Sequence, residues 1–182
     1  VAQLDAADSQ ANERVAQAQA CLGRAHASEA VKLLQEAMED YPAHTGAGGA
    51  LEAAEEAREQ ALSAWQTYDQ ALQSTEKTLK DRLLDEAVQA LPELARLRKA
   101  VPSDTAADWW QAFIRSEQSN QKLADDANAA LAQFQASLER AAQHEEAGRL
   151  AAAKNDYEEA RAFCSGSTKL EASYARTTAA LV

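Results

Sequence analysis

The chain carries almost nothing that would interrupt a helix or fill the faces of a β-sheet. Only 6 glycines and 3 prolines are spread over 182 residues, so the elements between them have to be long. About a quarter of the residues are alanine, and leucine, glutamine, glutamate, lysine and arginine supply much of the rest; all lose little on entering a helix. β-Branched and aromatic residues, which pack the pleated faces of a sheet, are scarce. The sequence therefore predicts an all-α fold.

Apolar residues recur at steps of three and four along nearly the whole chain, which is the spacing of one helix face. Glycine and proline mark where this pattern stops, most clearly in the stretch 43–49. We expect six to seven helices that alternate between long and short. They cover about residues 4–25, 28–41, 50–80, 83–101, 105–147, 150–163 and 168–181.

Three of these helices begin with residues typical of helix N-termini. Ser28 is expected to cap the second helix. Thr105 and Asp108 form a capping box, and Thr168 with Glu171 forms another.

Two positions are expected to disturb predicted helices. Pro92 predicts a kink, or a restart of the helix with proline in its first turn. A break near 119–120 is an alternative to one continuous helix over 105–147.

The charge balance argues against two classes of partner. The chain has 18 basic and 29 acidic side chains, a formal net charge of −11, which repels phosphate backbones and anionic lipid headgroups. No apolar run approaches the ~20 residues of a membrane span. We therefore expect a soluble protein that binds neither nucleic acid nor a membrane. Because the chain begins with valine, we expect part of a larger protein, and the compartment stays open between cytoplasm and periplasm.

No residue pattern indicates catalysis or a cofactor. The three histidines are scattered and lack the spacing of a metal centre, and the glycines near residue 46 lack the lysine of a phosphate-binding loop. We expect a protein that is not an enzyme and has no cofactor. Cys21 and Cys164 are either free thiols, the more common case in helical proteins, or a disulfide if the fold brings them together.

A spacing of small and large residues recurs in the short helices at a period of roughly 60 residues. The pattern is a small residue, a large one four positions later, a small one after three more and a proline after five more. In the second copy Leu97 replaces the second small residue, and in the third copy Ser165 replaces the proline. The copies are Ala30, Leu34, Ala37 and Pro42; Ala90, Leu94, Leu97 and Pro102; and Ala153, Tyr157, Ala160 and Ser165. We expect one domain with repeat-like units at about 1–46, 47–103 and 104–166, followed by a C-terminal helix at 167–182.

This spacing resembles the second helix of a tetratricopeptide repeat, where small residues let two helices approach and a bulky one packs between them. The resemblance covers about a quarter of the chain, and the period here is nearly twice the ~34 residues of that family. The aromatic, Leu-Gly and Tyr signature of the family's first helix does not occur in the three copies. The resemblance implies a right-handed array of antiparallel helices that binds a protein or peptide partner on a concave face.

Trp109, Trp110 and Phe113 are the strongest candidates for partner recognition. Adjacent residues on a helix point about 100° apart, so both indoles are fully buried only if this stretch is flanked on two sides. In that case they belong to the core; otherwise one indole is exposed and serves as an aromatic anchor in an interface.

A short basic run is the second candidate for partner recognition. Arg96, Arg98 and Lys99 lie near the predicted end of a helix. Cations at this end interact favourably with the helix dipole, which is one explanation for the run. Docking of an acidic peptide is the other.

These observations favour a non-catalytic scaffold of helical-repeat type that mediates protein–protein contacts. The alternative is a dimeric helical bundle that serves as a sensor or stalk in a bacterial signalling or envelope protein. The heptad-like spacing in 61–79 and 105–138 suits that alternative, whereas the period of about 60 residues favours the scaffold.

Overall fold

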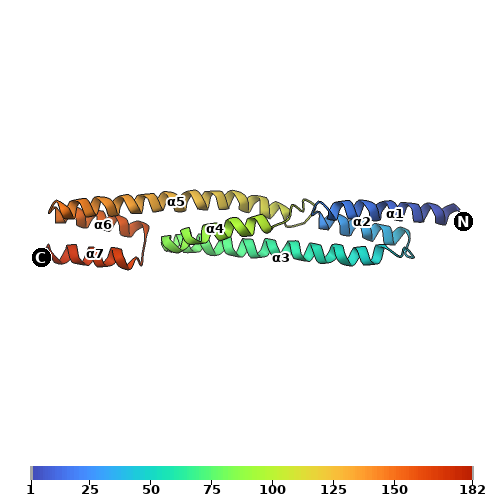
Figure 1. The fold of residues 1–182 in the computed structure, drawn as a ribbon, viewed down its shortest axis with the longest axis horizontal. Helices are drawn as coiled ribbons and strands as arrows, with labels where there is room; N and C mark the ends of the chain where they lie inside the picture. Colours follow the sequence, from blue (N-terminus) through green and yellow to red (C-terminus); the bar gives the residue numbers. More distant parts are fainter. Residues whose placement is uncertain (1, 182) are drawn as a thin grey trace. The chain divides into compact units, whose positions relative to one another are not determined.

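The computed structural model describes residues 2–181, and this part of the chain contains seven α-helices and no strands. The predicted all-α class and number of helices are confirmed. Figure 1 shows the helices in order: α1 (Ala2–Leu22), α2 (Ala27–Asp40), α3 (Ala47–Lys80), α4 (Leu84–Ala100), α5 (Trp110–Glu146), α6 (Leu150–Phe163) and α7 (Thr168–Ala179). Within residues 2–181, no helix combines the length and the apolarity needed to cross a membrane.

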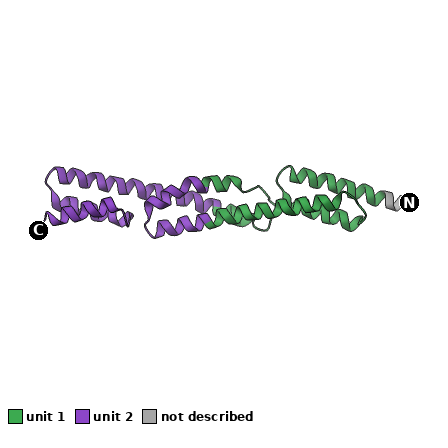
Figure 2. Ribbon diagram, turned by 60° about the horizontal axis from the view of Figure 1, so that its bottom comes forward, with its two compact units in different colours: residues 1–70, 95–116 green, residues 71–94, 117–182 purple. Residues whose placement is uncertain are grey.

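Contacts divide the chain into two compact units (Figure 2). Unit 1 consists of residues 1–70 and 95–116, and unit 2 of residues 71–94 and 117–182. Helices α3, α4 and α5 each contribute residues to both units. The division into repeat-like units that end near 46, 103 and 166 stays a prediction.

The core of unit 1 contains small residues at the contacts between helices. Ala18 of α1, Ala30 of α2 and Ala54 of α3 are fully buried in one cluster. Val31 and Leu34 of α2 fill the remaining space. Alanine lets helix backbones approach closely, so the contacts between these helices exclude water although the side chains are small.

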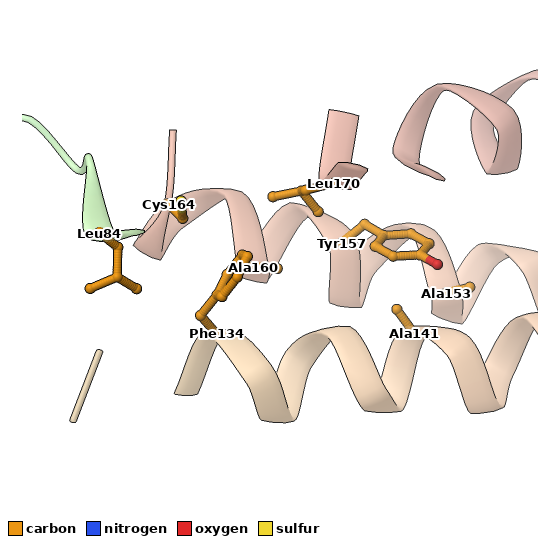
Figure 3. Close-up of a cluster of buried hydrophobic side chains, with 8 residues drawn as sticks. All are labelled: Leu84, Phe134, Ala141, Ala153, Tyr157, Ala160, Cys164 and Leu170. Carbon is orange, nitrogen blue, oxygen red and sulfur yellow. The ribbon is translucent and has the colours of Figure 1, made fainter. Parts of the chain in front are cut away.

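The core of unit 2 is built in the same way around α6 (Figure 3). Phe134 and Ala141 of α5 face Ala160 and Ala153 of α6, and Leu170 of α7 packs into the same cluster. Leu84, Tyr157 and Cys164 complete the buried set. Helix α6 therefore has apolar partners on both α5 and α7.

Three turns within residues 2–181 share one backbone geometry. Each has a residue in the left-handed region after a long helix: Ala25 with φ 63°, Arg82 with φ 60° and Gly148 with φ 72°. In each, the next amide donates to a carbonyl five residues earlier, as in a Schellman motif, at 2.9, 3.0 and 2.8 Å. A short helix begins two residues after the left-handed position every time.

These turns align the short helices more securely than the residue spacing does. Ala30 and Ala153 lie five residues after their left-handed positions and are fully buried. The residue in the same place of α4 is Ala87, also fully buried, and not Ala90, which the spacing selects. Burial of these faces is common to many alanine-rich helix pairs, so the tetratricopeptide-like arrangement stays a prediction.

The helix starts differ from the sequence predictions in three places. Helix α2 begins at Ala27, so Ser28 lies inside it and is not the cap. Helix α5 begins at Trp110, and the proposed capping box of Thr105 and Asp108 lies in turns before it. Helix α7 is capped by Ser167, whose hydroxyl accepts a hydrogen bond from an amide in the first turn at 3.4 Å.

Neither Pro92 nor 119–120 divides its helix, and a kink at Pro92 stays a prediction. Helix α4 continues through Pro92, so the restart is wrong. Pro92 is on the exposed side of α4, where water can bind the carbonyl that lacks an amide partner. Helix α5 also continues through 119–120.

Candidate functional site

Five aromatic rings of unit 1 form one cluster. Trp65 and Tyr68 come from α3, Trp109 directly precedes α5, and Trp110 and Phe113 lie in its first turn. The rings of Trp65 and Trp109 stack with centroids 6.1 Å apart and planes 11° apart. Phe113 meets Trp65 edge-on at 5.8 Å and lies 5.2 Å from Trp110. Such pairs stabilise their mutual orientation beyond simple burial.

The two indoles fall between the alternatives set by the sequence. Trp65, Tyr68 and Phe113 are buried, whereas Trp109 and Trp110 are each half-buried. Each indole thus packs on the cluster with one part and meets solvent with another. The ring of Phe113 is only 5 % exposed and contacts both indoles. A direct partner contact of these three residues stays a prediction.

The basic run lies on the last turns of α4. Arg96, Arg98 and Lys99 are exposed, and Arg98 and Lys99 belong to the final turn. This is the place where cations interact favourably with the helix dipole. Docking of an acidic peptide there stays a prediction.

A groove of about 620 Å³ opens beside Trp109 within unit 1. Its walls come from the start of α2, from α3 and from the segment that precedes α5. The lining residues are Ser28, Arg58, Glu59, Leu62, Ala106, Ala107, Asp108 and Trp109. Of the six residues that the sequence singled out, the groove includes Trp109.

Leu62 is the groove residue that sequence reasoning missed most clearly. It is 39 % exposed, one of three large apolar side chains of the described residues that remain so accessible. The heptad-like stripe of α3 runs through Ala61, Trp65 and Tyr68, which are buried. Leu62 lies outside that stripe, and a leucine in such a position was the feature of the sequence that could have indicated an exposed apolar side chain.

Asp104 lies at the N-terminus of α2, next to this groove. Its side chain is fully buried, and Oδ2 accepts a hydrogen bond from the amide of Ser28 at 2.8 Å. Oδ1 has no hydrogen-bond partner among the described residues. His26, the residue before α2, contributes no side-chain cap. Asp104 therefore caps α2 from 76 residues away, and its charge suits the positive end of the helix dipole.

A cluster of polar side chains joins three helices of unit 2. The carboxylate of Glu145 on α5 accepts hydrogen bonds from the Tyr157 hydroxyl of α6 at 3.0 Å and from Arg176 of α7 at 3.2 Å. The hydroxyl of Thr177 on α7 also donates to Glu145. The cluster borders a groove of about 680 Å³ that includes Phe134.

These contacts shift the pKa values of two groups in the cluster. The hydrogen bond from Thr177 lowers the pKa of Glu145, and those from Tyr157 and Arg176 act in the same direction. Burial raises the pKa of Tyr157, and its bond to Glu145 raises it further. The carboxylate therefore stays ionised and the phenol stays protonated, the pair of states that ties α5 to α6 and α7.

Both cysteines carry free thiols. Cys21 belongs to unit 1 and is half-buried, and Cys164 is buried in the core of unit 2. Among residues 2–181, no three His, Cys, Asp or Glu side chains lie together in a way that could hold a metal ion.

Comparison of the chain with protein-family models, with curated proteins and with solved structures gives no significant match.

Proposed function

We propose that the protein is a non-catalytic scaffold of helical-repeat type that binds a protein partner through the groove beside Trp109. The observation that carries the proposal is an accessible apolar side chain, Leu62, next to a half-buried indole in a groove of about 620 Å³. Tryptophan in a partly enclosed site is the residue type most enriched among interface hot spots.

The packing of Trp109 supports this assignment. Its stacking on buried Trp65 fixes the orientation of the indole before any partner arrives. A side chain that is already ordered loses less entropy when a partner covers it. The three similar turns before α2, α4 and α6 support the repeat architecture, and a tetratricopeptide-like arrangement of the helices is part of the proposal.

A dimeric sensor or stalk is the second candidate. It is favoured by the length of α3 and α5, which run for 34 and 37 residues without interruption. Ile114, 37 % exposed near the start of α5, would then contact a second copy of the chain.

Two measurements on the full chain separate the candidates. Light scattering on a sizing column gives the mass over a range of concentrations, and a random-peptide display library tests for ligands. We expect a monomer at every concentration and selected peptides that bind Leu62→Ala more weakly than they bind Ile114→Ala. A dimer that dissociates on Ile114→Ala substitution, with no peptides selected, would instead establish the stalk.

A further inference from the structure

The charges around the groove define the kind of partner that it suits. We propose that the groove binds a basic amphipathic segment, in which an apolar side chain covers Leu62 and Trp109 while a flanking lysine or arginine pairs with Glu59 and Asp108. This inference rests on the proposed function and names the partner chemistry of the same site.

The floor of the groove supplies an apolar contact of limited size. Leu62 is 39 % exposed and Trp109 is half-buried, and Ala106 and Ala107 add small side chains beside them. The volume of about 620 Å³ lies within the range of ~300–1,000 Å³ that is usual for binding pockets. One aliphatic or aromatic anchor from a partner therefore suits the floor.

The rim of the groove carries an excess of negative charge. Glu59 and Asp108 are exposed, and Arg58 is the one cation among the lining residues. Within residues 2–181, the side chains of these three residues have no hydrogen-bond or ion-pair partner. Two unpaired carboxylates against one guanidinium leave the rim at −1, and buried Asp104 behind Ser28 makes the surroundings more negative.

The same arrangement disfavours an acidic partner. A helix N-terminus attracts anions, but at α2 the carboxylate of Asp104 already accepts from the amide of Ser28. The chain as a whole carries a net charge of −11, which accelerates the approach of a cationic segment and slows that of an anionic one.

Two synthetic helical peptides test the inference against the intact chain. The first is an alanine-based helix with one leucine flanked by lysines at spacings of three and four, and the second has glutamate in place of each lysine. Fluorescence anisotropy of the labelled peptides gives both dissociation constants at low and at physiological salt. We expect the lysine peptide to bind at least about tenfold more tightly at low salt, with the difference shrinking as salt screens the charges.

Matched variants locate the binding site. Leu62→Ala is expected to weaken the lysine peptide about fivefold to tenfold, whereas Ile114→Ala, which removes a side chain of similar exposure outside the groove, leaves it unchanged. The double variant Glu59→Gln with Asp108→Asn is expected to reduce both the affinity and its salt dependence. Glu52→Gln, on an exposed part of the same helix, is the control for charge. All of these side chains are exposed, so the variants should keep their melting curves.

Equal affinity for the two peptides, or no effect of the groove variants on the lysine peptide, would overturn the inference. The proposed function has a separate outcome. If library peptides that depend on Leu62 are acidic or neutral, the scaffold stands and the basic partner is wrong. If no library peptide depends on Leu62 and the chain is a dimer, the scaffold itself fails.

Discussion

The cap that Asp104 provides for α2 leads to a quantitative prediction. Replacing Asp104 with alanine removes the acceptor of the hydrogen bond that the Ser28 amide donates to Oδ2, which is 2.8 Å long and partly buried. Loss of an N-cap costs about 1 kcal/mol and up to ~2 kcal/mol. A buried amide left without a partner costs ~1–3 kcal/mol, and this describes the same bond, so the two figures are not added. We expect Asp104→Ala to lower the free energy of unfolding by about 2 kcal/mol.

Two further variants isolate the cause. Asparagine caps helices nearly as well as aspartate, so Asp104→Asn should lose less than about 1 kcal/mol. Asp108→Ala removes an exposed carboxylate from the same segment and should change stability by no more than about 0.5 kcal/mol.

Urea unfolding of the full chain, followed by far-UV circular dichroism, measures all three variants. Native-state hydrogen exchange gives a local reading, because a loss of about 2 kcal/mol should accelerate exchange at the start of α2 about thirtyfold. The reasoning fails if Asp104→Ala is no more destabilising than Asp108→Ala. It also fails if Asp104→Asn is as destabilising as the alanine variant, since an amide oxygen that can accept the same hydrogen bond would then not preserve the cap.

Three more perturbations test other contacts. Because the folded state lowers the pKa of Glu145, its contribution to stability is present above the ordinary glutamate pKa of about 4.3 and is lost as pH falls through the lower folded value. Glu145→Gln should therefore flatten the acid side of a plot of urea midpoint against pH. The ring Nδ1 of His44 accepts from the amides of Gly46 and Ala47 at 3.2 and 3.1 Å, so His44→Ala should cost about 1 kcal/mol in urea unfolding, and His44→Asn, which supplies a similarly placed acceptor, should cost less. Ala25→Gly should increase the free energy of unfolding by about 0.5 kcal/mol and so raise the melting temperature, because φ 63° strains any residue with a Cβ. A lower melting temperature would contradict this.

Helix ends that depend on the local backbone follow from the sequence. Helix α1 stops at Leu22, directly before Gly23, and α5 stops two residues before Gly148. Gly148 has φ 72°, a conformation that glycine adopts without strain. The predicted end of α5 at 147 is within one residue of the observed end, whereas the apolar spacing carried the predicted end of α1 to 25, three residues too far. Glycine placement is informative here because the interactions that stop a helix lie within a few residues of one another.

Helix starts depend on the tertiary structure to a greater degree. The Thr105 and Asp108 box is a sound local pattern, yet the chain there forms turns in which the Ala107 amide donates to the Asp104 carbonyl. That backbone places the Asp104 side chain at the start of α2. A cap supplied across 76 residues leaves no pattern in any short window of sequence.

The candidate site also has features that the sequence predicts and features that depend on the tertiary structure. The neighbouring tryptophans were recognisable as unusual in a chain with only 5 % aromatic residues. Their stacking on Trp65, the exposure of Leu62 and the position of Glu59 beside them come from the way α3 packs within unit 1.

The sequence by itself determined that the chain is helical and where most helices end, because those properties depend on residues within one or two turns of each other. Tertiary structure decided which faces are covered. Alanine is tolerated both in a core and at the surface, so the helical spacing in this chain does not distinguish a buried stripe from an exposed one. Leu62 remains accessible and Asp104 is fully buried because of what packs around them, and that depends on segments far apart in the chain.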